Sequence, residues 1–304
     1  MISLLMISVM KTCPSEVTPL TVERLLEAGA AYLCRHGMEA EEAQSQARIL
    51  LSEVLHCSLS ALTLQAKRVL EEALVQRLRE QFKRIASGEP IQYVLGTWPF
   101  HNIMLRTDAR ALIPRPETEE LVERILRSEV WARAEHIADI GTGTGAIILA
   151  LAHAARGTNR RFTAVDLSEA ALSLAQENAQ ALGLSDVVTF VHGNGAGVLP
   201  ACSCDILVSN PPYIATAEVN QLPSHILDHE PRMALDGGAD GLDILRQIIL
   251  DGTQVLKPSG RLFFEIGDEQ GLSMQRLLER AGYADVVVAR DFAGHHRYAE
   301  GSLL

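Results

Sequence analysis

The chain has 304 residues, of which 47 % are hydrophobic and 21 % are charged. That composition is ordinary for a globular protein and excludes a disordered, collagen-like or coiled-coil chain. Acidic residues outnumber basic ones by 38 to 27, for a formal net charge of −11, which disfavours a protein that binds nucleic acid over a basic face.

The cysteines and the apolar segments predict a cytoplasmic protein that does not associate with membranes. No apolar run reaches the roughly 18 residues that a membrane span requires. Residues 1–19 begin with apolar residues but lack a basic segment and a cleavage site, so we expect a disordered extension and not a signal peptide. The cysteines form no C-x-x-C pair, which is typical of a reducing compartment: Cys13, Cys34, Cys57, Cys202 and Cys204.

Residues 20–90 have a helical pattern, with apolar residues recurring at three- and four-residue steps, as in the run from Val22 to Leu33. We predict a bundle of four or five helices that recognises a protein substrate. The sequence Ser-Gly-Glu-Pro at 87–90 marks a boundary. Residues 91–110 then predict a linker with a β-hairpin, its two strands lying between Tyr93 and Arg106.

Residues 111–304 alternate between apolar strands and amphipathic helices, which predicts a parallel sheet with helices on both faces. The first predicted helix is 117–128, and two more cover 146–155 and 169–182. The predicted strands are 136–140, 162–166, 187–192, 205–209, 261–266 and 286–289.

A glycine-rich turn follows the first of these strands. Gly141, Gly143 and Gly145 alternate with Thr142 and Thr144, between the end of a strand and the start of a helix. Glycines there permit a tight turn and let a ligand approach the bare backbone. The pattern also fits a dinucleotide fingerprint, so by itself it leaves NAD and S-adenosylmethionine open.

Two carboxylates accompany this turn. Asp166 ends the second strand, where a carboxylate accepts hydrogen bonds from ribose hydroxyls of either cofactor. Asp139 precedes the glycines by two residues; it would repel a pyrophosphate but neutralise a methionine amine. The acidic excess is concentrated after Leu95, where 27 acidic residues stand against 17 basic ones. Together with this excess, Asp139 favours a cationic sulfonium cofactor.

The strand 205–209 ends in Asn210-Pro211-Pro212-Tyr213. Two prolines stiffen the backbone and remove two N–H donors. A rigid row of acceptors remains, in which the Asn210 amide oxygen and the Pro211 carbonyl can each accept one N–H of a planar amine. The Tyr213 ring can pack on the face of the substrate. This pattern indicates transfer to an amide or exocyclic NH2 group.

The sequence resembles the release factor glutamine methyltransferase family over about residues 20–302. The motifs that carry the resemblance are Gly88-Glu89-Pro90-Ile91-Gln92-Tyr93, Phe100, Leu112-Ile113-Pro114-Arg115-Pro116-Glu117-Thr118-Glu119, Asp139 to Gly145, Asn210 to Tyr213, Glu230-Pro231-Arg232, and Leu235 with Gly237 to Leu242. The resemblance implies a class I methyltransferase, with a seven-stranded doubly wound, Rossmann-like sheet and a small N-terminal helical domain.

The resemblance also implies the reaction: a methyl group passes from S-adenosyl-L-methionine to the side-chain N5 of the glutamine in the Gly-Gly-Gln motif of peptide chain release factors. It implies catalytic roles for Asn210, Pro211 and Tyr213 and substrate contacts from these residues, Pro212 and Phe100. The implied cofactor contacts are Asp139, Gly141, Thr142, Gly143, Thr144, Gly145, Asp166, Asn194, Gly195 and Asn210. We expect a monomer without a metal and without direct nucleic-acid binding.

Three positions leave alternatives open. The segment with Arg115, Glu117 and Thr118 either closes over the methionine end of the cofactor or simply begins a helix. Glu230 and Arg232 form an ion pair with each other or order the substrate loop. Relatives place an acidic and then a bulky residue where Asn194 and Gly195 stand, so the packing of adenine is not defined here.

Other activities remain as alternatives. A sister enzyme that methylates glutamine in a ribosomal protein shares much of this pattern. An adenine-N6 methyltransferase would use the same pocket chemistry on a flipped base, but the acidic charge disfavours it. A nucleotide-binding oxidoreductase, or a binding module without catalysis, is disfavoured by Asn210 and Tyr213.

Overall fold

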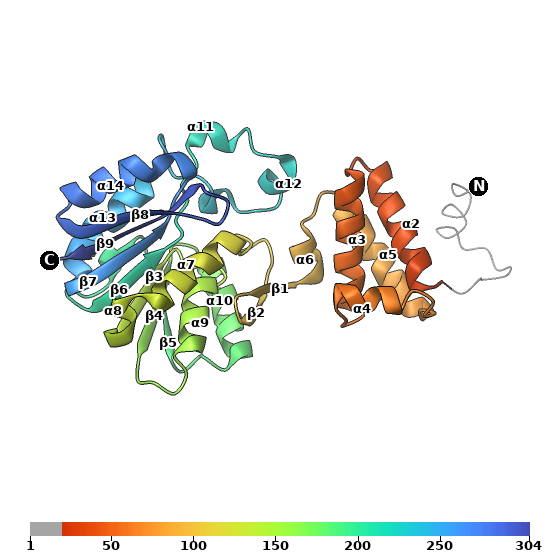
Figure 1. Ribbon diagram of the computed structural model, residues 1–304, viewed down its shortest axis with the longest axis horizontal. Helices are drawn as coiled ribbons and strands as arrows, with labels where there is room; N and C mark the ends of the chain where they lie inside the picture. The colour runs from red at the N-terminus through yellow and green to blue at the C-terminus, as the bar shows by residue number, and fades with distance from the viewer. Residues whose placement is uncertain (1–19) are drawn as a thin grey trace. The chain divides into compact units, whose positions relative to one another are not determined.

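The computed structural model describes residues 20–304, with the side chains of 224 and 225 left out (Figure 1). The predicted disordered extension, 1–19, lies outside the described residues. The chain divides into two compact units, residues 1–95 and 96–304. In the described part, no helix is both long enough and apolar enough to cross a membrane.

The first unit is helical: its described helices are α2 (Val22–Arg35), α3 (Ala40–Val54), α4 (Leu59–Leu64), α5 (Glu72–Ala86) and α6 (Ile91–Leu95). Thr21 caps α2 by accepting from the Arg24 N–H, as a helix start requires. Helices α2 and α5 pack closely at Gly29, where an added Cβ would lie 2.2 Å from the Phe82 ring. The predicted bundle is therefore present, and α2 and α5 approach each other closely at Gly29.

The predicted hairpin exists but begins later than expected. Strands β1 (Thr97–Phe100) and β2 (Ile103–Arg106) form an antiparallel pair. The expected strand residues Tyr93 to Leu95 are helical instead, because Pro90 starts a turn whose carbonyl accepts from the N–H groups of Tyr93 and Val94.

The second unit contains a seven-stranded sheet with the order β5-β4-β3-β6-β7-β9-β8. Strands β3 to β7 pair in parallel with one another, and β9 pairs antiparallel with both β7 and β8. The predicted class I methyltransferase sheet is confirmed. The strands are β3 (His136–Ile140), β4 (Arg161–Asp166), β5 (Val188–His192), β6 (Cys204–Ser209), β7 (Leu256–Glu265), β8 (Tyr283–Arg290) and β9 (His296–Leu303).

Helices cover both faces of this sheet (Figure 1). Alternate side chains of a strand point to opposite faces, so Ile137 of β3 packs in one core and Ala138 in the other. The first core is shared with α7 (Pro116–Arg127), α8 (Glu129–Arg133), α9 (Ala146–Ala154) and α10 (Glu169–Leu182), and the second with α13 (Asp243–Val255) and α14 (Gly271–Arg280). Short helices α11 (Thr216–Val219) and α12 (Ser224–Leu227) lie in the long connection after β6.

Strand order reverses beside β3, which fixes the position of a ligand crevice. Strands β4 and β5 extend the sheet on one side of β3, and β6 begins the extension on the other side. In open sheets of this kind, ligands bind beyond the carboxyl ends of the strands at the reversal point. The glycine turn follows β3, Asp166 ends β4, and Asn210 follows β6, so all three lie at this edge of the sheet.

Candidate active site

The glycine turn after β3 has the conformation that its residues predict. Gly141, Gly143 and Gly145 all have positive φ, at 72°, 57° and 81°. No described atom lies within 4 Å of the position that a Cβ of Gly141 would occupy, so the backbone there is open to a ligand. An added Cβ at Gly145 would instead lie 2.8 Å from Leu149 Cδ1, which explains the glycine at the start of α9.

The two predicted carboxylates flank this turn. Asp166 Oδ2 accepts from the Gly143 N–H at 2.8 Å, and its Oδ1 accepts from the Ser168 N–H at 2.8 Å. Asp139 is 1 % exposed, and its Oδ2 accepts from the Thr142 hydroxyl at 2.7 Å. Its Oδ1 is buried without a hydrogen-bond partner among the described residues. An unpaired buried oxygen of this kind favours a donor or a cation from a ligand.

Burial also changes the protonation of both carboxyls. It raises the pKa of Asp139 to about 7; the hydrogen bond from Thr142 opposes this rise, and the charge of Asp166 adds to it. Burial likewise raises the pKa of Asp166 above its usual range, against the hydrogen bonds from backbone N–H groups. The turn therefore carries two neighbouring acidic groups that a cation would stabilise in the ionised form.

Asn178 also positions the turn, although no local pattern in the sequence identifies it. It is 1 % exposed on α10, and its Nδ2 donates to the Thr144 carbonyl at 2.9 Å. The same side chain bonds to both backbone groups of Arg106, at 2.7 and 3.2 Å. Asn178 thus joins the turn to the end of strand β2.

The predicted acceptor residues lie directly after β6, a strand next to β3 in the centre of the sheet. Pro211 is buried, while Asn210, Pro212 and Tyr213 are half-buried. Asn210 Nδ2 donates to Thr118 Oγ1 at 3.0 Å, which leaves Oδ1 at the other end of the carboxamide. Tyr213 donates from its hydroxyl to Glu265 Oε1 at 3.4 Å, and burial raises its pKa above the ordinary range of a phenol.

Residues 210–213 are held in place by the loop 237–241 and by Gln270, which pack closely against their backbone. The carbonyl of Tyr213 accepts from Gln270 Nε2 at 2.9 Å. A Cβ at Gly237 would lie 2.6 Å from the Pro212 carbonyl oxygen, and one at Gly241 would lie 2.3 Å from that of Tyr213. Only glycine permits the 237–241 loop to pass this near to the Pro212 and Tyr213 carbonyls. The loop therefore restricts the position of the backbone of residues 212 and 213.

Glu265 connects α7 to the acceptor row and was not identified from the sequence. It ends β7, is 1 % exposed, and its Oε2 accepts from the Thr118 hydroxyl at 2.6 Å. Burial raises its pKa to about 7, against the hydrogen bond from Thr118 and the charge of Arg297. An isolated glutamate at a strand end gives no local pattern, and its partner Thr118 is 147 positions away.

The possibility of an ion pair between Glu230 and Arg232 is wrong. Glu230 instead pairs with Arg115 at 2.6 Å and accepts from the Ile113 N–H at 3.2 Å. Arg232 bonds to Asp236 and Asn220 at the surface. The Glu-Pro-Arg motif therefore contacts the Ile-Pro-Arg-Pro motif, because the buried carboxylate requires a cation and finds it outside its own segment.

Asn194 and Gly195, which replace the acidic and the bulky residue of the family pattern, lie after β5. Gly195 has φ 74° and ψ −171°, a region that glycine alone adopts readily. A Cβ there would lie 2.6 Å from Gln247 Nε2 and 2.7 Å from Asp251 Oδ2, so α13 occupies the space of the bulky residue. Asn194 is exposed, and so is the apolar side chain of Leu167, directly after Asp166, at 51 %.

Phe100 lies in the sheet core next to α7, and is 1 % exposed. Its contact with substrate stays a prediction, because packing in this core is sufficient to explain why Phe100 is buried. Within the described residues, no group of three His, Cys, Asp or Glu side chains is arranged to hold a metal ion. The described cysteines are free.

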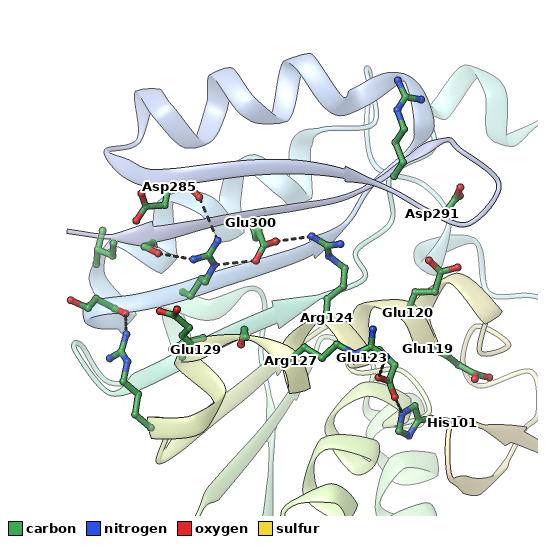
Figure 2. A pocket seen from close by; sticks show the side chains of 18 of the residues that line it. His101, Glu119, Glu120, Glu123, Arg124, Arg127, Glu129, Asp285, Asp291 and Glu300 are labelled. Atoms are coloured by element: carbon green, nitrogen blue, oxygen red, sulfur yellow. Dashed lines mark hydrogen bonds and ion pairs between the residues drawn. The ribbon is translucent and has the colours of Figure 1, made fainter.

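A second hollow lies away from these residues, between α7 and the strands β7, β8 and β9 (Figure 2). Figure 2 shows Arg124 directed toward Glu300, at 2.8 Å, and His101 beside Glu123, also at 2.8 Å. None of the predicted site residues lines this hollow. Because many of its charges are paired with one another, we place the site at the carboxyl ends of β3, β4 and β6.

Comparisons with known proteins agree with this geometry. A family model described as the PrmC N-terminal domain matches residues 24–96, and one described as the methyltransferase small domain matches residues 117–239. The release factor glutamine methyltransferase of Bradyrhizobium diazoefficiens is 39 % identical over 272 residues, which cover 88 % of this chain and 91 % of that protein. The chain belongs to the release factor glutamine methyltransferase family.

Other relatives support the family assignment. The release factor glutamine methyltransferase of Moorella thermoacetica is 37 % identical over 279 residues, or 91 % of this chain and 97 % of that protein. Among solved structures, the hMettl16 catalytic domain, crystallised with an RNA hairpin, has a TM-score of 0.53 at 15 % identity, covering 78 % of this chain and 85 % of that one. This likeness shows the fold alone, whereas the family assignment rests on the sequence relatives.

Proposed function

We propose that this chain transfers a methyl group from S-adenosyl-L-methionine to the side-chain amide nitrogen of the glutamine in the Gly-Gly-Gln motif of peptide chain release factors. Family membership supports the class of substrate, because the relatives are named for it. The single structural observation that supports the chemistry is the Asn210 carboxamide, whose Nδ2 is bonded to Thr118 and whose Oδ1 is left to accept.

The glycine turn and its carboxylates fit this cofactor. When bound, S-adenosylmethionine supplies an electrophilic methyl group on a sulfonium. Asp139 would receive the methionine amine at its unpaired Oδ1, and Asp166 would receive the ribose hydroxyls. Gly141 and Gly143 would let the cofactor lie against the backbone, and Leu167 would provide the apolar surface for adenine that Gly195 lacks.

Asn210 and Pro211 would activate the glutamine by orienting it. An amide nitrogen is a weak nucleophile because its lone pair is delocalised into the carbonyl. Acceptance of its two hydrogens by Asn210 Oδ1 and the Pro211 carbonyl would stabilise the positive charge that develops on nitrogen during attack. The same contacts hold the nitrogen in line for transfer, which removes an entropic part of the barrier. Tyr213 would pack on the planar carboxamide.

The N-terminal helical unit would recognise the release factor, since a folded protein substrate needs surface beyond the crevice. The site residues described above come from a single chain, and we propose a monomer. We further propose that the protein acts in the cytoplasm, where release factors work, and that the acidic chain binds no nucleic acid directly.

The direct test is mass spectrometry of a purified release factor after incubation with the protein and S-adenosylmethionine. We expect one added methyl group on the glutamine of Gly-Gly-Gln. A glutamine-containing ribosomal protein and an adenine-containing oligonucleotide serve as alternative substrates in parallel reactions. Methylation of either one in preference to the release factor would contradict the proposal.

A further inference from the structure

The Asn210 carboxamide has two chemically different ends of nearly the same size. Its oxygen can accept from a substrate NH2 group, whereas its nitrogen can only donate. Packing discriminates poorly between the two orientations, because O and NH2 occupy similar volumes. The orientation is therefore determined by the hydrogen-bond partner on the side away from the substrate, and that partner is Thr118.

Thr118 is itself constrained by Glu265. Its hydroxyl has one proton, which it donates to Glu265 Oε2 at 2.6 Å. A hydroxyl that has given its proton to a carboxylate can only accept from its other neighbour, and Asn210 Nδ2 lies 3.0 Å away on that side. Thr118 is 4 % exposed and Glu265 is 1 % exposed, so water has little access to replace either partner.

We propose that Glu265, acting through the Thr118 hydroxyl, determines which end of the Asn210 carboxamide faces the substrate. This proposal rests on the proposed function. Glu265 and Thr118 are then positioning residues: they act on the substrate through Asn210 and set the preference for a carboxamide over a carboxylate. Because Glu265 also accepts from the Tyr213 hydroxyl, it connects both ends of the acceptor row.

Two variants test whether Glu265 and Thr118 determine the orientation of the Asn210 carboxamide: Glu265→Gln should reverse it, and Thr118→Val should leave it unselected. In Glu265→Gln, the new amide can donate to Thr118, so the hydroxyl can donate to Asn210 Oδ1 and turn Nδ2 toward the substrate. In Thr118→Val, the hydroxyl is lost and nothing selects an orientation. The second variant leaves the Glu265 carboxyl in place, so the two variants break the same link at different residues.

The measurement is the affinity of each variant for two release factors, one native and one with glutamate in place of the target glutamine. The wild type should prefer the native form. We expect this preference to fall about tenfold or more in both variants, the scale of losing a hydrogen bond of about 1 to 1.5 kcal/mol. Affinity for S-adenosylmethionine should stay within about twofold.

Two further variants control for structure. Thr118→Ser restores the hydroxyl and should recover most of the preference. Thr163→Val removes another buried threonine hydroxyl, which lies 2.8 Å from His136 Nε2 at the opposite end of the sheet. It should reduce stability without changing the preference.

Equal loss of affinity for both release factors in the Thr118→Val variant would overturn the proposal, because a structural role would lower both alike. That variant also decides the question if Glu265→Gln fails to fold. Failure of the proposed function is distinct: the wild type itself would then fail to methylate the native release factor.

Discussion

The guanidinium of Arg115 lies 2.6 Å from the carboxylate of Glu230, a residue 115 positions later in the chain. The side chain of Glu230 is 2 % exposed and also accepts from the Ile113 N–H. This pair joins the segment before α7 to the connection that follows the acceptor row. Two motifs that the sequence presents separately are therefore parts of one contact.

We predict that Glu230→Ala lowers the free energy of unfolding by about 3 kcal/mol, because it leaves the Ile113 N–H and the Arg115 charge without their partner. Urea denaturation measures the change. Arg232→Ala, which removes a surface pair from the same motif, is the matched control and should cost under about 1 kcal/mol. If both variants lost the same free energy of unfolding, the buried Glu230–Arg115 pair would not have the structural role that we assign to it.

Replacing Asn210 with alanine should reduce turnover by about 100-fold or more, since it removes one preorganised acceptor of the substrate NH2 group. Methyl transfer to the release factor at saturating cofactor is the measurement. Asn159→Ala, at an exposed position before β4, is the control and should be neutral. Wild-type turnover by the Asn210→Ala variant would remove Asn210 from the reaction.

The buried carboxyl of Asp139 predicts a pH-dependent stability. Its pKa in the folded protein is raised to about 7, so folding binds a proton and the ionised form destabilises the fold. Without cofactor, the wild type should lose stability relative to Asp139→Asn as the pH rises from about 4 to 7, by an amount on the order of 4 kcal/mol. The buried carboxyl of Glu265 also lowers stability as the pH rises, but it is present in both the wild type and the Asp139→Asn variant, so it cancels in the comparison.

The same carboxyl predicts the opposite trend for cofactor binding. An ionised Asp139 pairs with the methionine amine, so affinity for S-adenosylmethionine should rise between about pH 6 and pH 8 in the wild type. Titration calorimetry at several pH values measures it. The Asp139→Asn variant should bind more weakly and vary less with pH; a parallel rise in the variant would assign the effect to another group.

Gly195→Ala should destabilise the protein by about 1 to 3 kcal/mol, because its backbone conformation is strained for any residue with a Cβ. Thermal denaturation compares it with Gly157→Ala, a glycine that also has positive φ but has open space around it. The Gly157 variant should lose less. A neutral Gly195→Ala would mean that the loop after β5 rearranges freely.

Removing residues 1–90 should spare cofactor affinity and weaken methylation of the release factor, since the residues assigned to the cofactor all lie in the second unit. The comparison requires both the binding constant for S-adenosylmethionine and the kinetics with release factor. Unchanged substrate kinetics in a truncated protein that binds cofactor would refute recognition by the helical unit.

The sequence predicted those parts of the fold that local patterns encode. Strands β3 to β6 are apolar runs, and α10 was predicted with the bounds that the structure has. Strand β9 was not located, because residues 296–303 carry polar and charged side chains along much of their length. This segment is a strand because β7 and β8 supply its hydrogen bonds on both sides.

The same distinction applies to the site. The glycine turn and the acceptor row are contiguous motifs with a recognisable chemistry, so the sequence identified Asp139 and Asn210. Asn178 and Glu265 are single residues whose partners lie more than thirty positions away, and Gln270 reaches the Tyr213 carbonyl 57 positions earlier in the chain. Their roles depend on tertiary contacts, which no spacing in one sequence reveals.

The close passage of Gly237 and Gly241 behind the acceptor row has a consequence for engineering. A side chain at either position would push the Pro212 or Tyr213 carbonyl outward, and the transferable group and its recipient would no longer be aligned. Libraries aimed at new recipients should therefore leave these two glycines constant.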